Sequence, residues 1–142
     1  MKLILKLSFL AILVMLASAP VSPWMPGRVF AQDSAGQSFS TLRSADLAAM
    51  LAKKDFLLIN VHVPYEGEIE QTDAFIAFDK IGQTPGALPD DKNAKIVLYC
   101  LSGRMSEIAA NELARLGYKQ VSHLGGGMRD WQAGGFRVVE KR

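Results

Sequence analysis

The sequence predicts an α/β protein in which an open parallel sheet of four to five strands has helices on both faces. Two nearly continuous apolar runs, residues 56–61 and 95–99, lack the alternation of a half-exposed strand and are typical of strands covered on both sides. A third short strand, residues 121–124, is expected after an amphipathic helical pattern. This alternation of strand and helix patterns favours one parallel sheet with crossover helices. The length of 142 residues allows one domain.

The first half of the domain begins with a helix and continues into irregular chain. Ser44 is the expected N-cap of a helix that ends near Lys54, because a serine side chain accepts hydrogen bonds from the first helical amides. The apolar face of this helix holds Leu47, Met50 and Leu51. We expect a strand over residues 56–61 and a loop over residues 64–73. A short strand with one helical turn follows over residues 74–81, and turns are expected at residues 84–86 and 89–92.

The second half repeats the strand and helix pattern twice. The strand over residues 95–99 leads into an amphipathic helix, expected from Ser106 to Leu116 and ended by Gly117. The strand over residues 121–124 leads through three glycines into a short helix, expected over residues 128–133.

The N-terminal residues have the layout of a secretory signal peptide. Lys2 and Lys6 precede an uncharged run of 13 residues, Leu7 to Ala19. Two cleavage-like triplets end at Ala19 and at Ala31, and the second is preferred because Pro20 directly follows the first. We expect cleavage there and a periplasmic or secreted protein. An uncleaved leader would act as a membrane anchor, and it would be the only membrane contact. We therefore expect a signal peptide over residues 1–31, a linker over residues 32–37 and one domain over residues 38–142.

Charge and cysteine content exclude several classes of protein. The formal net charge is +2, but the leader holds three basic residues and no acidic one, which leaves the rest near −1. No basic field attracts nucleic acid, so no nucleic-acid partner is expected. The single cysteine, Cys100, excludes an internal disulfide framework and a multi-cysteine zinc site. We expect no metal site, and a monomer.

One segment, residues 100–106, carries the candidate chemistry. Ligands of open parallel sheets bind beyond the carboxyl ends of the strands, and Cys100 follows such a strand. Gly103 permits a positive φ, so that successive amide N–H groups can form an anion-binding nest where a helix begins. A cysteine there is pushed toward the nucleophilic thiolate, and we expect its sulfur to be exposed and ionised. The alternative is an inert core thiol.

The segment Cys100-Leu101-Ser102-Gly103-Arg104-Met105-Ser106 resembles the active-site loop of rhodanese-like sulfurtransferases, in which a cysteine starts the loop and a glycine follows three positions later. Other parts are similar to the family in the same order. They are the strand at residues 58–62, the irregular segment 66–81, the helix and strand within 109–124, and the glycine run 125–127 followed by Trp131. The resemblance covers residues 38–138 and implies a rhodanese-like fold.

The resemblance implies an enzyme that moves sulfane sulfur from a donor such as thiosulfate to a thiophilic acceptor. Cys100 would be the catalytic nucleophile and would carry the sulfur as a persulfide. No metal or organic cofactor is needed, and the partners are a small sulfur-containing anion and the acceptor. The substrate-binding residues implied are Leu101, Ser102, Gly103, Arg104, Met105, Ser106 and His62.

Three positions depart from the pattern of the family. Asn60 and His62 stand where its strand usually ends with Asp and Arg, and Met105 occupies a position that is often basic, with Arg104 one step earlier. These changes motivate an alternative, a non-catalytic rhodanese-like module that binds a partner or carries sulfur.

Other chemistries fit the residues less well. A cysteine phosphatase needs an arginine six positions after the cysteine, where Ser106 stands. A Cys–His hydrolase could pair Cys100 with His62, or less readily with His123, but nothing marks an oriented triad. The acidic stretch over residues 66–73 lacks the ligand spacing of a calcium loop and is better interpreted as a solvated loop or rim.

Overall fold

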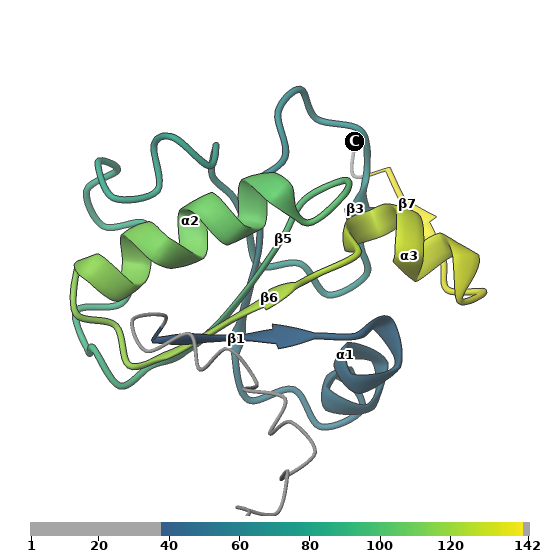
Figure 1. Cartoon of the computed structure of the whole chain (residues 1–142), viewed down its shortest axis with the longest axis horizontal. Helices are drawn as coiled ribbons and strands as arrows, with labels where there is room; N and C mark the ends of the chain where they lie inside the picture. Colours follow the sequence, from purple (N-terminus) through teal and green to yellow (C-terminus); the bar gives the residue numbers. More distant parts are fainter. Residues whose placement is uncertain (1–37, 141–142) are drawn as a thin grey trace, which may run out of the picture. The chain divides into compact units, whose positions relative to one another are not determined.

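The computed structural model describes residues 38–140 and contains seven strands and three helices in that range (Figure 1). In chain order they are β1 (Phe39–Leu42), α1 (Ser44–Leu51), β2 (Leu57–Asn60), β3 (Glu68–Ile69), β4 (Ala74–Phe75), β5 (Lys95–Tyr99), α2 (Arg104–Arg115), β6 (Gln120–Leu124), α3 (Gly127–Ala133) and β7 (Val138–Val139). Five strands form one parallel sheet in the order β1-β6-β5-β2-β4. This confirms the predicted fold class.

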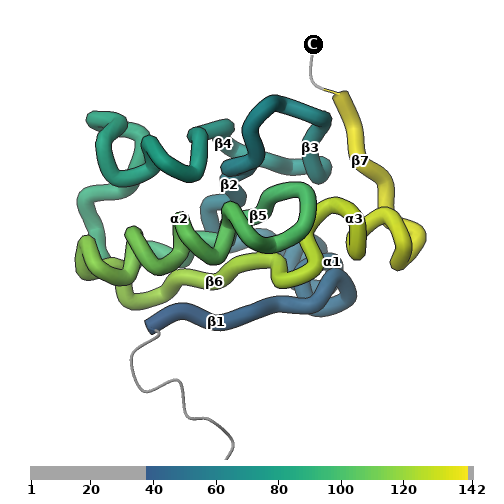
Figure 2. Tube along the Cα trace, turned by 45° about the horizontal axis from the view of Figure 1, so that its top comes forward, coloured from purple at the N-terminus to yellow at the C-terminus, as the bar shows by residue number. Residues whose placement is uncertain are grey.

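Helices cover both faces of the sheet, α2 on one face and α1 with α3 on the other (Figure 2). Because successive side chains of a strand point to opposite faces, β5 contributes to both cores. Ile96 and Leu98 pack on the α2 side, whereas Val97 and Tyr99 pack with α1 and α3. Cys100 continues this alternation and returns to the α2 side.

Helix α2 begins at Arg104, two residues earlier than the sequence predicts. Its N-cap residue is Gly103, whose φ of +94° lies in the left-handed region. A Cβ on this glycine would lie 1.8 Å from the carbonyl oxygen of Gly125, so no side chain fits. The turn out of β5 therefore takes only Cys100 to Gly103, and Arg104 and Met105 belong to the first helical turn rather than to the loop.

Helix α1 differs from the prediction at both ends. Its N-cap residue is Arg43, whose amide donates to Oδ2 of Asp46 at 3.3 Å. Ser44 lies inside the helix, and its hydroxyl donates to Asp130 of α3 at 2.7 Å. The bond ties α1 to α3. The helix ends at Leu51, three residues earlier than predicted.

The sequence does not predict β1, β3 or β7. Strand β1 is an edge strand whose central residues, Ser40 and Thr41, are polar and exposed, so its apolar pattern is weak. Strands β3 and β7 pair antiparallel and have two residues each, too few for any periodicity. Strand β4 confirms the short strand expected over residues 74–81, but the chain after it forms hydrogen-bonded turns and no helix.

Replacing Tyr99 with phenylalanine should destabilise the fold. The Tyr99 hydroxyl is buried, accepts the amide N–H of Ile69 at 3.0 Å and lies 2.7 Å from the hydroxyl of Thr72. Its loss leaves buried polar groups without a partner, which costs about 1–3 kcal/mol of unfolding free energy. Denaturant titration measures this loss. Tyr118→Phe is the comparison and should cost less, because its half-buried hydroxyl makes one bond, to Pro89 O.

The leader expected over residues 1–31 and the linker expected over residues 32–37 lie outside the described residues, so both stay predictions. Within residues 38–140, no helix combines the length and the apolar character needed to cross a membrane.

Candidate active site

The candidate site lies at the carboxyl edge of the parallel sheet. Cys100 directly follows β5, and His62 follows the neighbouring strand β2 by two residues. His123 lies on β6, on the other side of β5, one residue before that strand ends. Three separate chain segments thus bring a thiol and two imidazoles to this edge, as expected for ligand sites of open parallel sheets.

The loop after Cys100 is held from one side by α3. The carbonyl oxygens of Cys100 and Leu101 accept hydrogen bonds from the amides of Met128 and Arg129, at 2.9 and 3.0 Å. In a trans peptide the N–H points opposite to the C=O, so the next two amides, of Leu101 and Ser102, point away from α3. The contact with α3 therefore orients consecutive loop amides in one direction.

The amide of Gly103 completes this arrangement at the sulfur. Its N–H donates to Cys100 Sγ at 3.1 Å. The same residue caps α2, a helix of 12 residues, whose N-terminus carries a partial positive charge. Both features lower the energy of a negative charge on the sulfur or on a group bound to it.

The expectation that the sulfur is exposed is wrong. Cys100 is only 1% exposed and belongs to the core between the sheet and α2. Strand alternation turns its side chain toward α2, and half-buried Met105 in the first turn of α2 packs against this core. A donor therefore reaches the sulfur only after a covering side chain moves.

Replacing Met105 with alanine should open the path to Cys100. Met105 packs against the core that contains Cys100, so a smaller side chain loosens this core beside the loop and leaves the Gly103 N–H contact in place. We expect faster alkylation of Cys100 by iodoacetamide, by about ten-fold, since the amount of open conformer limits the rate. Ile108→Ala is the matched control, an exposed apolar residue of the same helix, and should leave the rate unchanged. Equal alkylation rates in the unchanged protein and both variants would mean that Met105 does not limit access to Cys100.

The predicted binding residues of the loop differ in exposure. Ser102 and Arg104 are exposed, and Leu101 and Met105 are half-buried. Gly103 and Ser106 are buried with Cys100. Arg104 stands in the first turn of α2 and makes no hydrogen bond to Cys100, so it is free to reach a ligand outside the loop.

His62 does not contact Cys100 through a hydrogen bond. Its Nε2 lies 2.9 Å from Oε2 of Glu66, and its Nδ1 is buried without a partner. Its amide donates to the side chain of Asn60 at 2.9 Å, and the Asn60 amide group donates to Gly67 O at 2.9 Å. These bonds of Asn60 and His62 fix the conformation of the chain after β2. His62 therefore does not form the Cys–His pair of a hydrolase.

The acidic stretch is not a solvated loop along its whole length. Glu68 is buried, with 7% of its surface exposed. Asp73 accepts the amide of Leu58 at 2.7 Å and the ammonium of Lys54 at 2.5 Å. Glu66 faces His62. Among residues 38–140, no three His, Cys, Asp or Glu side chains gather as ligands for a metal ion.

A contact that sequence patterns do not reveal joins Ser106 to His123. The Ser106 hydroxyl lies 3.2 Å from His123 Nδ1 and 3.7 Å from Cys100 Sγ. Burial lowers the pKa of His123, while the charge of Glu107 and a backbone hydrogen bond with Gly103 act in the opposite direction. The contact could have been expected from the position of His123 on a strand that neighbours β5.

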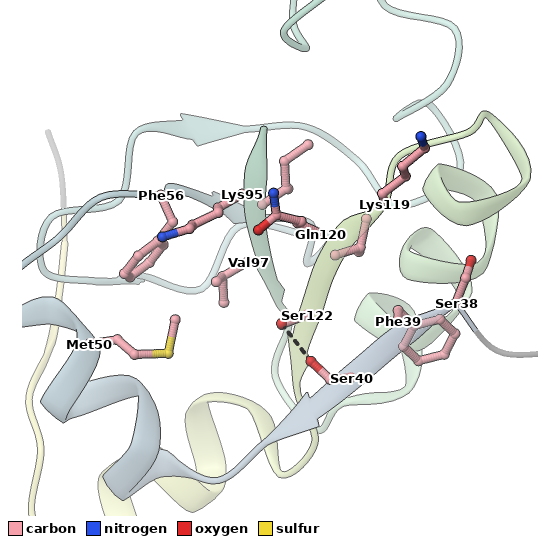
Figure 3. Close-up of a pocket in the computed structure, with 12 residues that line it drawn as sticks. Ser38, Phe39, Ser40, Met50, Phe56, Lys95, Val97, Lys119, Gln120 and Ser122 are labelled. Atoms are coloured by element: carbon pink, nitrogen blue, oxygen red, sulfur yellow. Dashed lines mark hydrogen bonds between the residues drawn. The ribbon is translucent and has the colours of Figure 1, made fainter. Parts of the chain in front are cut away.

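A cavity of about 410 Å³ lies at the opposite, amino edge of the sheet (Figure 3). Ser40 and Ser122 line it and are hydrogen-bonded at 2.7 Å, and Met50, Lys95 and Lys119 also line it. No residue of the Cys100 loop contributes to its wall. This cavity is therefore separate from the candidate site.

Comparisons with known proteins agree with this geometry. The profile of the rhodanese-like domain matches residues 44–134. A tRNA uridine(34) hydroxylase of Erwinia tasmaniensis is 28% identical over 96 residues, which cover 63% of this chain but only 27% of that protein.

Two solved structures are similar over most of the chain. A protein of unknown function from Rhodopseudomonas palustris, described as a possible tyrosine phosphatase, has a TM-score of 0.62 and 26% identity, covering 80% of this chain and 98% of that one. A rhodanese-related protein of Thermoplasma volcanium has a TM-score of 0.60 and 25% identity, covering 72% of this chain and 99% of that one.

Proposed function

Because this chain belongs to the rhodanese-like domain family, we propose that it is a sulfurtransferase that carries sulfane sulfur as a persulfide on Cys100. The donor is a small sulfur-containing anion such as thiosulfate, and the acceptor is a thiophile. The observation that carries the proposal is the hydrogen bond from the Gly103 N–H to Cys100 Sγ, 3.1 Å long, at the N-terminus of α2.

The first half of the cycle loads sulfur onto Cys100. The thiolate of Cys100 attacks the outer sulfur of thiosulfate, so that a new S–S bond forms on Cys100 while the old S–S bond breaks. The electron pair of the broken bond leaves with sulfite. Amide N–H groups and the helix N-terminus stabilise the negative charge on the terminal sulfur of the persulfide.

The second half returns Cys100 to its starting state. A thiophile such as cyanide attacks the terminal sulfur, a C–S bond forms, and the electron pair of the S–S bond returns to Cys100 as thiolate. No net oxidation or reduction of the protein occurs over the cycle, and no cofactor takes part.

The burial of Cys100 favours a second candidate, a module that binds a partner or holds sulfur with little turnover. At 1% exposure the sulfur meets a small donor only after local movement. In this alternative, contact with a partner protein would open the loop.

Neither phosphatase nor hydroxylase activity is proposed. The sixth position after the cysteine is Ser106, which is buried and uncharged and cannot stabilise a transferring phosphoryl group as arginine does. The match to the tRNA hydroxylase spans about a quarter of that protein, 27% of its length, so its reaction is not carried over.

Turnover separates the two candidates. The full chain is incubated with thiosulfate and cyanide, and thiocyanate is measured over time. A sulfurtransferase forms many equivalents of thiocyanate per chain, and Cys100→Ser forms none. At most one equivalent per chain from the unchanged protein would overturn the enzyme and favour the carrier.

Replacing Arg104 with alanine should weaken the use of an anionic donor. The exposed guanidinium in the first turn of α2 is placed to donate to an anion at the helix N-terminus. We expect KM for thiosulfate to rise about ten-fold, with a smaller change in kcat. The control is Arg115→Ala in the last turn of the same helix, whose side chain pairs with Glu112. Unchanged KM in Arg104→Ala would mean that the arginine points away from the donor.

The proposal also places the protein outside the cytoplasm, in the periplasm or the medium. The basic n-region, the apolar run and the small residues before Ala31 support it. N-terminal sequencing of the mature protein from the exported fraction should begin at Gln32. A protein that keeps Met1 and sediments with membranes would indicate an uncleaved anchor instead.

A further inference from the structure

Ser106 Oγ lies at a junction beside the buried sulfur. The hydroxyl donates to Gly103 O at 2.9 Å, lies 3.2 Å from His123 Nδ1 and accepts from Cys100 Sγ at 3.7 Å. Ser106 is 0% exposed, so these protein groups are its partners. A hydroxyl has one proton to donate and two lone pairs to accept with. The proton of Ser106 is bonded to Gly103 O. When the hydroxyl turns from Gly103 O toward His123 Nδ1, Ser106 can give this proton to the ring and accept the thiol proton.

His123 continues this path toward the surface. Its ring is buried, with 5% of the residue exposed, and Phe39 packs edge-on against it at 5.4 Å between ring centroids. Its Nε2 lies 3.0 Å from the hydroxyl of Thr41, its register partner on β1. Thr41 is exposed on the edge strand of the sheet. Hydrogen-bonding groups thus run without a gap from the buried sulfur to solvent.

We propose that His123 is a positioning residue that accepts the proton of Cys100 through Ser106, and that Thr41 links its far nitrogen to solvent. The inference deepens the proposed sulfurtransferase function and rests on it. It names the groups that make the buried thiol nucleophilic.

The proton balance of the step is complete. The Ser106 hydroxyl first turns from Gly103 O to His123 Nδ1. The S–H bond of Cys100 then breaks and its proton passes to Ser106 Oγ, while the proton of Ser106 passes to His123 Nδ1. The relay requires the neutral tautomer with its proton on Nε2, from which the ring donates to Thr41 Oγ1 across the 3.0 Å contact. After the transfer, the imidazolium releases its Nε2 proton at the exposed Thr41, and the thiolate keeps the hydrogen bond from the Gly103 N–H.

The electrostatic surroundings of His123 suit a proton acceptor at neutral pH. Burial lowers its pKa from the ordinary value, so the ring is neutral there. Glu107 of α2 is the charged side chain whose field reaches the ring, and it acts against this lowering together with Gly103. The residues of strand β1 that contact the ring, Phe39 and Thr41, are uncharged. The rate should therefore fall on the acid side at a pH below the ordinary pKa of imidazole, which is about 6.5.

The test compares pH profiles for two reactions of the sole cysteine in the full chain. One is alkylation by iodoacetamide, which needs a nucleophilic sulfur but no sulfur transfer. The other is persulfide formation from thiosulfate in a single turnover. The variants are His123→Asn and Thr41→Val. The matched control is Ser122→Ala, which removes a hydroxyl bond between the same two strands, to Ser40.

The relay predicts that His123→Asn slows both reactions at neutral pH by about 100-fold and moves the acid limb to higher pH. Thr41→Val should give a smaller shift in the same direction, and Ser122→Ala none. In His123→Ala, added imidazoles should restore the rate, and more basic imidazoles should restore more. A purely structural role of the ring would not produce this dependence on basicity.

The outcomes separate the relay from the proposed function. Alkylation that depends on His123, without persulfide from any sulfane donor, would keep the relay and overturn the transferase. Persulfide formation with an unchanged pH profile in His123→Asn would keep the transferase and overturn the relay. A chain in which Cys100 reacts with neither reagent would overturn both.

Discussion

Replacing Gly103 with alanine is expected to slow persulfide formation on Cys100 severely while the two cores stay folded. The added Cβ would lie 1.8 Å from the oxygen and 2.7 Å from the carbon of the Gly125 carbonyl group, and backbone atoms cannot move aside cheaply. The loop must open, which takes the Gly103 N–H away from the sulfur. We expect the rate to fall by about 100-fold or more, the scale of losing an oriented amide donor.

Gly117→Ala provides the matched control for this change. Gly117 ends the turn after α2 with φ of +90°, close to the +94° of Gly103, but its Cβ would meet no atom within 4 Å. Both variants therefore carry the conformational cost of a left-handed alanine, about 1–2 kcal/mol. Only Gly103→Ala should lose the reaction. Equal rates of persulfide formation in the two variants would contradict the loop geometry.

Replacing Gly127 with alanine is expected to release the loop from its other side. At φ of +61°, the new Cβ would lie 2.5 Å from the carbonyl oxygen of Cys100 and 2.5 Å from the carbonyl carbon of Leu101. The start of α3 must then move away, and the amides of Met128 and Arg129 lose the loop carbonyls that they bind at 2.9 and 3.0 Å. The loop amides lose their common direction, and persulfide formation should fall about ten-fold or more.

This variant should also be less stable. The buried loop carbonyls lose partners, and the backbone conformation is unfavourable for alanine, which together cost at least about 2 kcal/mol of unfolding free energy. Gly135→Ala is the control, with φ of +85° and open space around its Cβ. Gly135→Ala should lose only the unfolding free energy that the unfavourable backbone conformation costs, and it should form persulfide at the normal rate. Full activity in Gly127→Ala would mean that α3 does not orient the loop.

The sequence predicts best the elements whose side chains alone decide the structure. The residues of β5 are apolar without alternation because both faces of the strand are covered, and the predicted bounds of residues 95–99 are confirmed. The start of α2 is two residues off because a left-handed Gly103 shortens the turn, and this conformation depends on the approach of Gly125. Edge strand β1 carries exposed Ser40 and Thr41, so no apolar pattern marks it.

The candidate site is predicted where it is local and missed where it is formed by distant segments. The position of Cys100 after a strand and before a helix follows from neighbouring residues. Its burial depends on packing against α2, which strand and loop patterns do not specify. The contact of Thr41 with His123 joins residues 82 positions apart, so only the sheet order brings them together.

Intact-mass measurement of the full chain after incubation with thiosulfate tests the central claim most directly. The account predicts a gain of one sulfur atom, which cyanide removes and which is absent in Cys100→Ser. Since the chain has one cysteine, the added sulfur has one place to reside. No gain in mass with thiosulfate or any other sulfane donor would contradict the account.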